Sequence, residues 1–338
     1  MSRFTSYYLY QKYEKVGDGE WTPTYPNEYS ISGDSENTMP LVIKSENDAQ
    51  CGYYPPIYRW TDTDDTICVF EDEHDYSQDY LTFDIVSAGT ITWCASALEI
   101  GRYIDYSLDN GETWTTILSY VRTYPYPTWP TINVNVGDKL LVRGTNREYC
   151  INSSKYSYFG GTAYYNLKGN IMSLIYGENY NTSDILPSDF NSYTFSYLFN
   201  NSRVINAEHL ILPATTLRSY CYSEMFSGCT SLTTAPELPA TTLANYCYYR
   251  MFRGCTGLTT APVLSATTLV EGCYNFMFNG CSNLNYIKCL AIDISATSST
   301  NGWVSGVAST GTFVKASSMS NWTTGNNGIP NNWTIQNA

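Results

Sequence analysis

Positive charge is scarce in this sequence. Its 18 Lys and Arg are outnumbered by 31 Asp and Glu, which gives a formal net charge of −13 at pH 7. Binding to a nucleic-acid backbone depends mainly on Lys and Arg, because these residues neutralise the phosphates. We therefore expect no nucleic acid among the partners.

Histidine is also rare, and enzymatic motifs are missing. Of the two histidines, His74 lies in an acidic stretch and His209 at one end of a repeat region. Neither belongs to a nucleophile elbow, a metal pair or a phosphate loop. A pair of carboxylates would suffice for a glycosidase, but the sequence nominates no pair. We expect a protein that is not an enzyme and needs no cofactor.

Paired cysteines and long apolar runs are absent as well. The 11 cysteines include no CxxC pair, which argues against a zinc site of the usual spacing. No run of about 18 apolar residues occurs, and the first residues lack the apolar segment of a signal peptide. We expect no membrane span, no bound metal, no classical export, and cysteines that are mostly reduced and buried.

Tyrosine is abundant instead, with 32 Tyr beside 8 Trp. Residues 1–79 alternate aromatic strand-like pieces with turns, which predicts a β-rich region that attaches the chain to a partner. The region ends in an acidic stretch with Asp62, Asp64, Asp65, Glu71, Asp72, Glu73, Asp75 and Asp79. Because EF-hand spacing and its glycine are missing, a solvated face or a contact with a basic protein is favoured. A cation site stays open.

Residues 80–178 predict a β-sandwich of the Ig-like or jelly-roll-like kind. Short strand-like segments alternate there with Gly, Asn and Asp turns. The segment from Asp109 to Gly111 indicates a hairpin, because Asn-Gly tolerates the positive φ angles of a tight turn.

Residues 179–338 contain a repeat of 26 residues. The repeated positions are Pro213 and Pro239; Cys221, Cys247 and Cys273; Met225, Met251 and Met277; Phe226, Phe252 and Phe278; Gly228, Gly254 and Gly280; Cys229, Cys255 and Cys281; and Leu232, Leu258 and Leu284. Such a period is typical of a solenoid, in which one unit cannot bury its apolar edge alone. We expect like residues of successive units to stack and build the core.

Each unit predicts a short helix and an extended return. Thr215 or Thr216 can cap the helix, and Gly228 can end it. One helical face carries Leu217, Cys221, Met225 and Phe226.

Both ends of the repeat region predict caps. Upstream, Phe199, Ser202 and Ile205 occupy the Phe, Cys and Leu places of a degenerate unit. Downstream, a polar tail with two Trp residues is expected to close the stack.

The motif L-P-x-T-T-L-x-x-x-C-Y-x-x-M-F-x-G-C-x-x-L starts at Leu212, Leu238 and Leu264, with Ser265 replacing the proline of the last copy. It resembles the BspA-type leucine-rich repeat. The resemblance implies an α/β solenoid of helices and short strands, so the whole chain is expected to be multidomain and mainly β before this solenoid. In that family the repeats serve adhesion on bacterial and protist surfaces.

The order of modules, with "YSLDNGETW" before the repeats and "GIPNNWTI" near the end, is similar to that of proteins from tailed, crAss-like phages of gut Bacteroidales. This resemblance implies a head or tail fibre or decoration protein, assembled in the host cytoplasm and located in the virion. Residues 1–79 would bind other virion proteins, the repeats would contact protein or host glycan, and the chain would form a dimer or trimer. The alternative is a bacterial adhesin, which would need an export signal or an anchor.

The segment with Ser107, Asp109, Gly111 and Trp114 resembles the Asp box of sialidase propellers, where it is a structural hairpin. The chain has a single copy and no assignable arginine triad. A structural hairpin is therefore favoured, and a glycan-cleaving enzyme is the third alternative.

Aromatic residues flank the repeated cysteines and are the candidate binding residues. With two arginines they form a low-charge set: Tyr220, Tyr222, Tyr246, Tyr248, Tyr249, Arg250, Arg253 and Tyr274. They predict a surface for glycan or protein contact. The alternative is that these rings pack against neighbouring units.

Overall fold

The computed structural model describes residues 75–97, 101–120, 128–187, 193–320 and 322–338 in full, and the backbone of six strands before them. These strands are β1 (Tyr13–Val16), β2 (Glu20–Pro23), β3 (Glu28–Ile31), β4 (Leu41–Lys44), β5 (Ile57–Thr61) and β6 (Ile67–Glu71). Strand β1 pairs with β2, and β3 to β6 form an antiparallel sheet. The chain divides into two compact units, Met1–Asp75 and Tyr76–Ala338. Most side chains of the acidic stretch lie outside the described residues.

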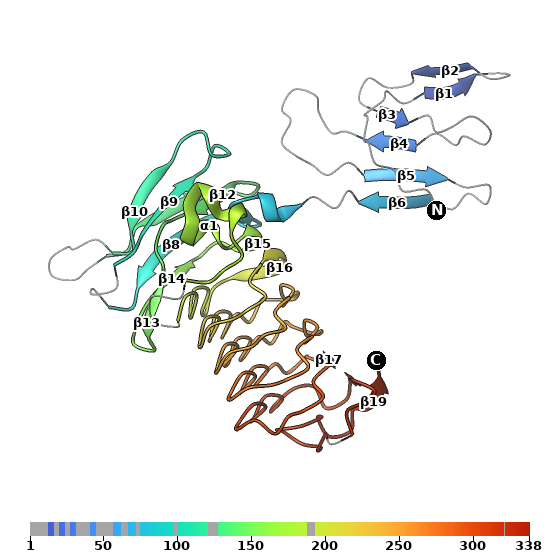
Figure 1. Ribbon diagram of the computed structural model, residues 1–338. Helices are drawn as coiled ribbons and strands as arrows, with labels where there is room; N and C mark the ends of the chain where they lie inside the picture. Colours follow the sequence, from blue (N-terminus) through green and yellow to red (C-terminus); the bar gives the residue numbers. More distant parts are fainter. Residues whose placement is uncertain are drawn as a thin grey trace. The chain divides into compact units, whose positions relative to one another are not determined.

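The second unit begins with two β-sheets (Figure 1). The strands of these sheets are β7 (Leu81–Ile85), β8 (Gly89–Ala95), β9 (Tyr103–Ser107), β10 (Thr115–Leu118), β11 (Thr131–Val134), β12 (Lys139–Arg143), β13 (Cys150–Asn152), β14 (Lys155–Gly161), β15 (Tyr165–Asn170) and β16 (Val204–Ile211). The same part of the chain contains the short helices η1 (Tyr76–Gln78), α1 (Ser173–Tyr176) and η3 (Gly177–Thr182). One sheet has the order β10-β9-β12-β7-β15-β16, and the other β11-β8-β14-β13. Phe83 of the first sheet contacts Phe159 of the second, with ring centroids 4.8 Å apart. The prediction of a mainly β chain is confirmed.

The first sheet runs across the boundary predicted near residue 178. Strand β16 pairs in parallel with β15 and belongs to the predicted repeat region. Residues 76–338 therefore form one compact unit in which the two regions share a sheet.

After β16 the chain makes stacked units, and each contains a run of turns. The turn runs cover 194–201, 219–228, 245–254, 271–280 and 297–306. In the second run, the N–H groups of Cys221, Ser223 and Met225 bond to carbonyls three residues earlier. The N–H groups of the even residues instead reach carbonyls of the next run at 2.7–3.1 Å, as Tyr222 does to Cys247.

The helix predicted from Leu217 onward is therefore wrong. An α-helix satisfies its own backbone with bonds to the fourth residue back, whereas here every second peptide bonds to the neighbouring run. Tyr220, Glu224 and Gly228 have positive φ, which gives the run a period of four. Apolar residues at i, i+4 and i+8 fit this period as well as that of a helix.

Like residues of successive runs stack in columns, as the 26-residue period predicts. The rings of Phe199, Phe226, Phe252 and Phe278 are nearly parallel, with centroids 5.4, 5.7 and 5.8 Å apart. Full burial of such a side chain contributes about 1.5–3 kcal/mol. The columns extend into the sheets, because Phe159 of β14 stacks on Phe199 at 5.8 Å.

The cysteines form columns of free thiols. The Sγ atoms of Cys229, Cys255 and Cys281 donate to the carbonyls of Phe199, Phe226 and Phe252 at 3.0, 3.1 and 2.9 Å. Burial raises the pKa of Cys229 to about 11 and that of Cys281 to about 12. All nine described cysteines are free and buried, so the prediction is confirmed for them.

The two ends of the stack are closed differently. At the first run, N–H groups of Tyr149 and Phe159 donate to the carbonyls of Thr194 and Leu198 at 2.9 and 2.8 Å. Strands β17 (Tyr286–Cys289), β18 (Thr312–Lys315) and β19 (Thr334–Asn337) form a parallel sheet at the other end. There the indole of Trp303 donates to Gly328 at 2.8 Å. No described helix is long and apolar enough to cross a membrane.

The predicted upstream cap is right for two of its three residues. Phe199 lies in the Phe column, and Ser202 lies 3.5 Å from the thiol of Cys229. Ile205 is only partly buried, whereas Val204 is fully buried. Asn206 lies opposite Thr234, which is 28 residues later, so this first unit is two residues longer than the 26-residue repeat. Val204 therefore occupies the place that Leu has in the later units.

Candidate functional site

The turn runs present a constant inner side and a variable outer side. Each of the three central runs turns Cys, Tyr, Met and Phe into the core. Four other columns of runs two to five vary from copy to copy: Ser219, Asn245, Glu271 and Thr297; Ser223, Tyr249, Asn275 and Asn301; Glu224, Arg250, Phe276 and Gly302; Ser227, Arg253, Asn279 and Ser305. Five of these residues are buried, namely Ser223, Glu224, Ser227, Asn275 and Gly302, and the others are at least partly exposed. We call the surface of these four columns, with Tyr193, Tyr197, Tyr220 and Tyr246, the outer face. Stacking of the units does not require particular residues in these columns, so the outer face is the candidate binding site.

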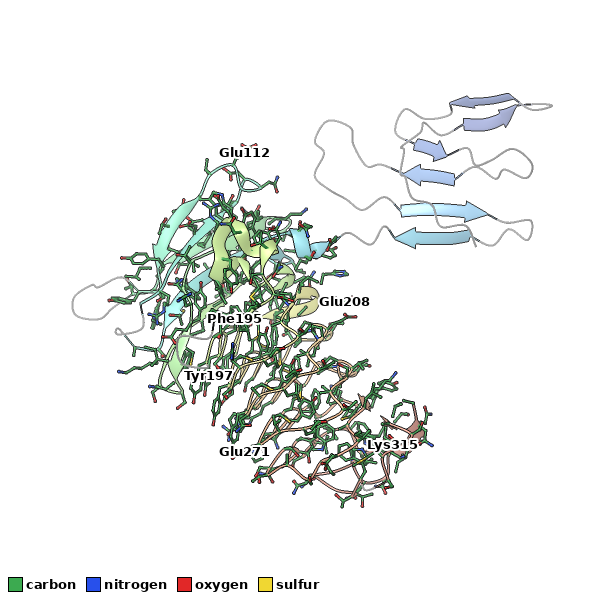
Figure 2. The ribbon with its side chains drawn as sticks, viewed as in Figure 1. Glu112, Phe195, Tyr197, Glu208, Glu271 and Lys315 are labelled. Carbon is green, nitrogen blue, oxygen red and sulfur yellow. The ribbon has the colours of Figure 1, made fainter. Side chains whose placement is uncertain are left out.

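The outer face lies on the turn side of the stack. Figure 2 shows Tyr197 and Glu271 opposite Glu208 and Lys315, which belong to β16 and β18. The strand side is therefore a separate surface.

A ladder of tyrosines runs along the outer face. Tyr193 stacks on Tyr220, and Tyr220 on Tyr246, with centroids 4.6 and 4.9 Å apart. The ladder ends at Gly272, where a Cβ would lie 2.2 Å from the Tyr246 ring. Stacking covers the ring faces, so this column offers a ligand mainly ring edges and hydroxyls.

A hydrogen bond to a carboxylate holds the last tyrosine of the ladder. The hydroxyl of Tyr246 donates to Glu271 Oε1 at 3.0 Å, and Asn245 Nδ2 donates to Oε2 at 3.3 Å. The bond to Glu271 raises the pKa of Tyr246. Asn245, Tyr246 and Glu271 therefore hold one another in place.

In a second column, polar and charged side chains of successive runs contact one another. The Tyr197 hydroxyl donates to Glu224 Oε1 at 2.9 Å, and Arg250 Nη1 lies 3.7 Å from the same oxygen. The guanidinium of Arg250 also lies 4.7 Å from the centre of the Tyr249 ring and 5.4 Å from that of Phe276. Arg250 therefore packs against two rings while part of its side chain stays exposed.

The predicted binding residues divide into two groups. Tyr220, Tyr246, Tyr249, Arg250 and Arg253 lie on the outer face. The structure brings them together with side chains that the sequence reasoning missed: Tyr193, Tyr197, Glu224, Glu271, Asn275 and Phe276. An alignment of the repeat copies would have shown several of these as positions that vary between copies.

Tyr222, Tyr248 and Tyr274 are not surface residues, which corrects that part of the prediction. They are 1, 2 and 1 % exposed, and their rings form an inner column. The period of four turns each of them inward beside the preceding cysteine. Burial raises the pKa of all three well above its ordinary value.

The Asp-box residues meet in the hairpin between β9 and β10. Ser107 Oγ accepts from the Gly111 N–H at 2.9 Å and donates to Asp109 Oδ1 at 2.6 Å. Thr113 donates to both oxygens of Asp109 at 2.9 and 2.5 Å. The bond from Ser107, followed by those from Thr113, lowers the pKa of Asp109 to about 2. The carboxylate is thus bonded within its own turn.

The tryptophan of this hairpin packs against two side chains. The guanidinium of Arg143 lies 4.0 Å from the centre of the Trp114 ring, and Tyr80 contacts the ring edge to face at 5.0 Å. Arg143 also pairs with Asp105 at 3.3 Å and with Glu178 at 2.6 Å. This geometry is that of a structural turn.

The strand side carries a shallow groove of about 250 Å³. Its walls are two copies of one segment: Thr233, Thr234, Ala235, Thr259, Thr260, Ala261 and Pro262. No titratable side chain lines it, so it offers no acid or base. Among the described residues, no group of three or more His, Cys, Asp or Glu side chains could hold a metal ion.

The chain has no match among family models, curated proteins or solved structures.

Proposed function

We propose that this chain is a non-enzymatic structural protein of a phage virion, a fibre or decoration on the head or tail. Its stacked units would be a short leucine-rich-repeat solenoid of the BspA type. The outer face would contact another virion protein or a glycan on the host surface. The supporting observation is the contrast between the constant core positions of the turn runs and the variable positions around them, most of which are at least partly exposed.

The backbone of the turn runs supports a binding role for this face. Each run is held to the next by a ladder of backbone hydrogen bonds, and its outward rings stack or pack on the next run. A preformed surface loses little conformational entropy when it binds, so a modest contact area can give useful affinity. Tyrosine and arginine are also enriched among residues that dominate binding energy.

The division of the chain supports attachment through residues 1–79. Residues 1–75 form a compact unit of their own, so one part can bind the particle while the other presents the outer face. The buried free thiols agree with assembly in a reducing host cytoplasm. Symmetric particles also favour a dimer or trimer of this chain.

Immunogold electron microscopy tests the location. An antibody against residues 179–338 would be applied to purified phage particles and to intact cells of the producing culture. We expect regular labelling at one position on capsids or tails. Label confined to cell envelopes would contradict the virion assignment and leave the adhesin in its place.

A further inference from the structure

The stack ends in a strand whose outer edge is open. Strand β19 is the last strand of the parallel sheet β17-β18-β19, and Figure 1 shows it at the end of the stack. Within the part of the chain that the structure describes, no strand pairs with the outer edge of β19. All four of its residues, Thr334–Asn337, are exposed. Such an edge is a template on which another strand can pair.

The turn side of the same end is closed. The segment between β18 and β19 covers the last turn run, where Asn327 Oδ1 accepts from the Gly302 N–H at 2.7 Å. The Trp322 ring stacks on the ring of Trp303, with centroids 5.6 Å apart. The chain then returns as β19. The opening is therefore confined to the strand side.

The backbone of β19 presents hydrogen-bonding groups on this edge. The N–H groups of Thr334 and Ala338 donate at 2.8 Å to carbonyls on or next to β18. Alternate residues of a strand direct their N–H and C=O groups to opposite sides. The groups of Ile335 and Asn337 therefore point away from β18, towards the open edge.

The side chains of the sheet leave one apolar residue without full cover. Ile287 of β17, Phe313 of β18 and Ile335 of β19 lie in register across the sheet. The first two are fully buried, whereas Ile335 is 48 % exposed. A strand added beside β19 would cover this side chain as β18 covers its neighbours.

The edge carries no feature that would block pairing. Natural edge strands are commonly protected by Lys, Pro or a β-bulge. Strand β19 contains neither Lys nor Pro, and its register with β18 has no shift. A regular edge strand of this kind is open to another strand.

The charge distribution favours a second copy of this chain as the partner. Residues 316–338 contain no Asp, Glu, Lys or Arg, although the whole chain has a net charge of −13. Two such chains repel each other, so their contact is most favourable where neither copy brings charge. A basic or an acidic partner would find no complementary charge on this edge.

We propose that β19 pairs antiparallel with β19 of a second copy and forms a dimer with two-fold symmetry. Ile335 of one copy lies opposite Ile335 of the other, and the two residues exchange both N–H···O=C hydrogen bonds. Their side chains then cover each other on one face of the joined sheet. In this register Thr334 lies opposite Gln336. The inference rests on the homo-oligomer of the proposed function and assigns its contact surface.

The structure favours a closed dimer over a longer assembly. A head-to-tail contact would need an open edge at the other end of the stack, but there the N–H groups of Tyr149 and Phe159 bond to the carbonyls of the first run. A two-fold contact uses the same edge of both copies and leaves none free. The expected assembly is therefore a dimer and not a trimer.

Sedimentation equilibrium of the full chain tests the pairing. One pair of four-residue strands buries far less than the roughly 1,200 Å² of a stable interface, so we expect a weak dimer with a Kd on the order of 100 µM. Measurements up to about 1 mM protein cover this range. Added salt should strengthen the dimer, because it screens the repulsion between two chains with a net charge of −13.

Two lysine substitutions on β19 make a matched pair. Ile335→Lys places like charges opposite each other at the two-fold axis and should raise the dimer Kd about tenfold or more. Gln336→Lys adds the same charge to the other face of the strand, opposite Thr334, and should change the Kd less than about threefold. Both positions are exposed, and thermal melts of the two variants establish that the stack is intact.

A mixed sample tests the register. Equimolar Ile335→Lys and Ile335→Glu chains bring opposite charges together at the axis, so the mixture should form a tighter dimer than either variant alone. This gain requires that position 335 faces itself across the contact, and a general change of surface charge at other positions would not produce it.

Four results would overturn the proposal. They are a monomer at every concentration, a trimer or larger assembly, equal weakening by Ile335→Lys and Gln336→Lys, or no gain in the mixed sample. A dimer that Ile335→Lys leaves unchanged would place the contact elsewhere in the chain and would also contradict it. None of these results bears on the virion location, which the labelling of particles tests separately.

Discussion

At the scale of single residues, glycines decide where the outer rings can lie. The Tyr246 ring occupies the space that a side chain at position 272 would need. Gly272 and Gly254 both have positive φ, at 61° and 73°, but a Cβ on Gly254 would meet its nearest atoms at 3.9 Å. The two positions therefore share the backbone strain and differ in the clash.

Substituting these glycines separates the two effects. Gly254→Ala should lower the free energy of unfolding by about 1–2 kcal/mol, the cost of a left-handed residue with a side chain. Gly272→Ala should cost about 1–3 kcal/mol more, because the Tyr246 ring must move. Denaturant unfolding of both variants checks this. Equal losses would mean that the ring shifts without cost.

The Asp109 carboxylate gives the hairpin a dependence on pH. Its pKa is lowered from 3.8 to about 2, so its contribution to stability is present above pH 3.8 and is lost as the pH falls through 2. Asp109→Ala should therefore lower the melting temperature at pH 6. The difference in melting temperature between the variant and the native chain should become smaller towards pH 2. A difference in melting temperature that does not change with pH would show that the Asp109 carboxylate does not stabilise the hairpin through its charge. A glycan-cleaving enzyme would instead lose hydrolysis in a variant that melts normally.

At the scale of elements, the strands and the stacked units keep their thiols out of solvent. The chain has 11 cysteines and nine of them are described, buried and free, which leaves two outside the described side chains. Burial raises the thiol pKa of Cys221 and Cys289 to about 12, and only the thiolate reacts readily. An aromatic disulfide reagent at pH 8 should therefore label at most two thiols quickly in the native protein and all 11 in denaturant. Fast labelling of three or more would show that some of the buried thiols become exposed readily.

The same element shows what a sequence can and cannot predict. Stacking of the Phe and Cys columns follows from the 26-residue spacing, because like residues must meet when units stack. The helix was wrong, since a spacing of four fits both an α-helix and a run of turns whose peptides bond to the neighbouring run. The inward side chains of Tyr222, Tyr248 and Tyr274 follow from that same difference. The hairpin at Asn110-Gly111 was predictable, because positive φ at both residues is a local requirement.

At the scale of the whole molecule, the β-sheets and the stacked units depend on each other. Their junction could not be read from the sequence, because the parallel pairing of β15 with β16 joins segments far apart and leaves no local pattern. The sheets supply N–H groups to the carbonyls of the first run, and Phe159 covers the ring of Phe199. Separating them would leave these carbonyls unpaired and expose one end of the apolar columns.

Truncation tests this dependence. A chain of residues 76–338 retains every contact within its compact unit and should melt in one cooperative transition near that of the full chain. A chain of residues 179–338 lacks β15, Tyr149 and Phe159, so its first run has no cover, and it should be insoluble or melt without a cooperative transition. Circular dichroism and size-exclusion chromatography of both fragments check this. A monomeric 179–338 fragment with an unchanged melting temperature would mean that the stack closes its own end, and that the sheets only position the outer face.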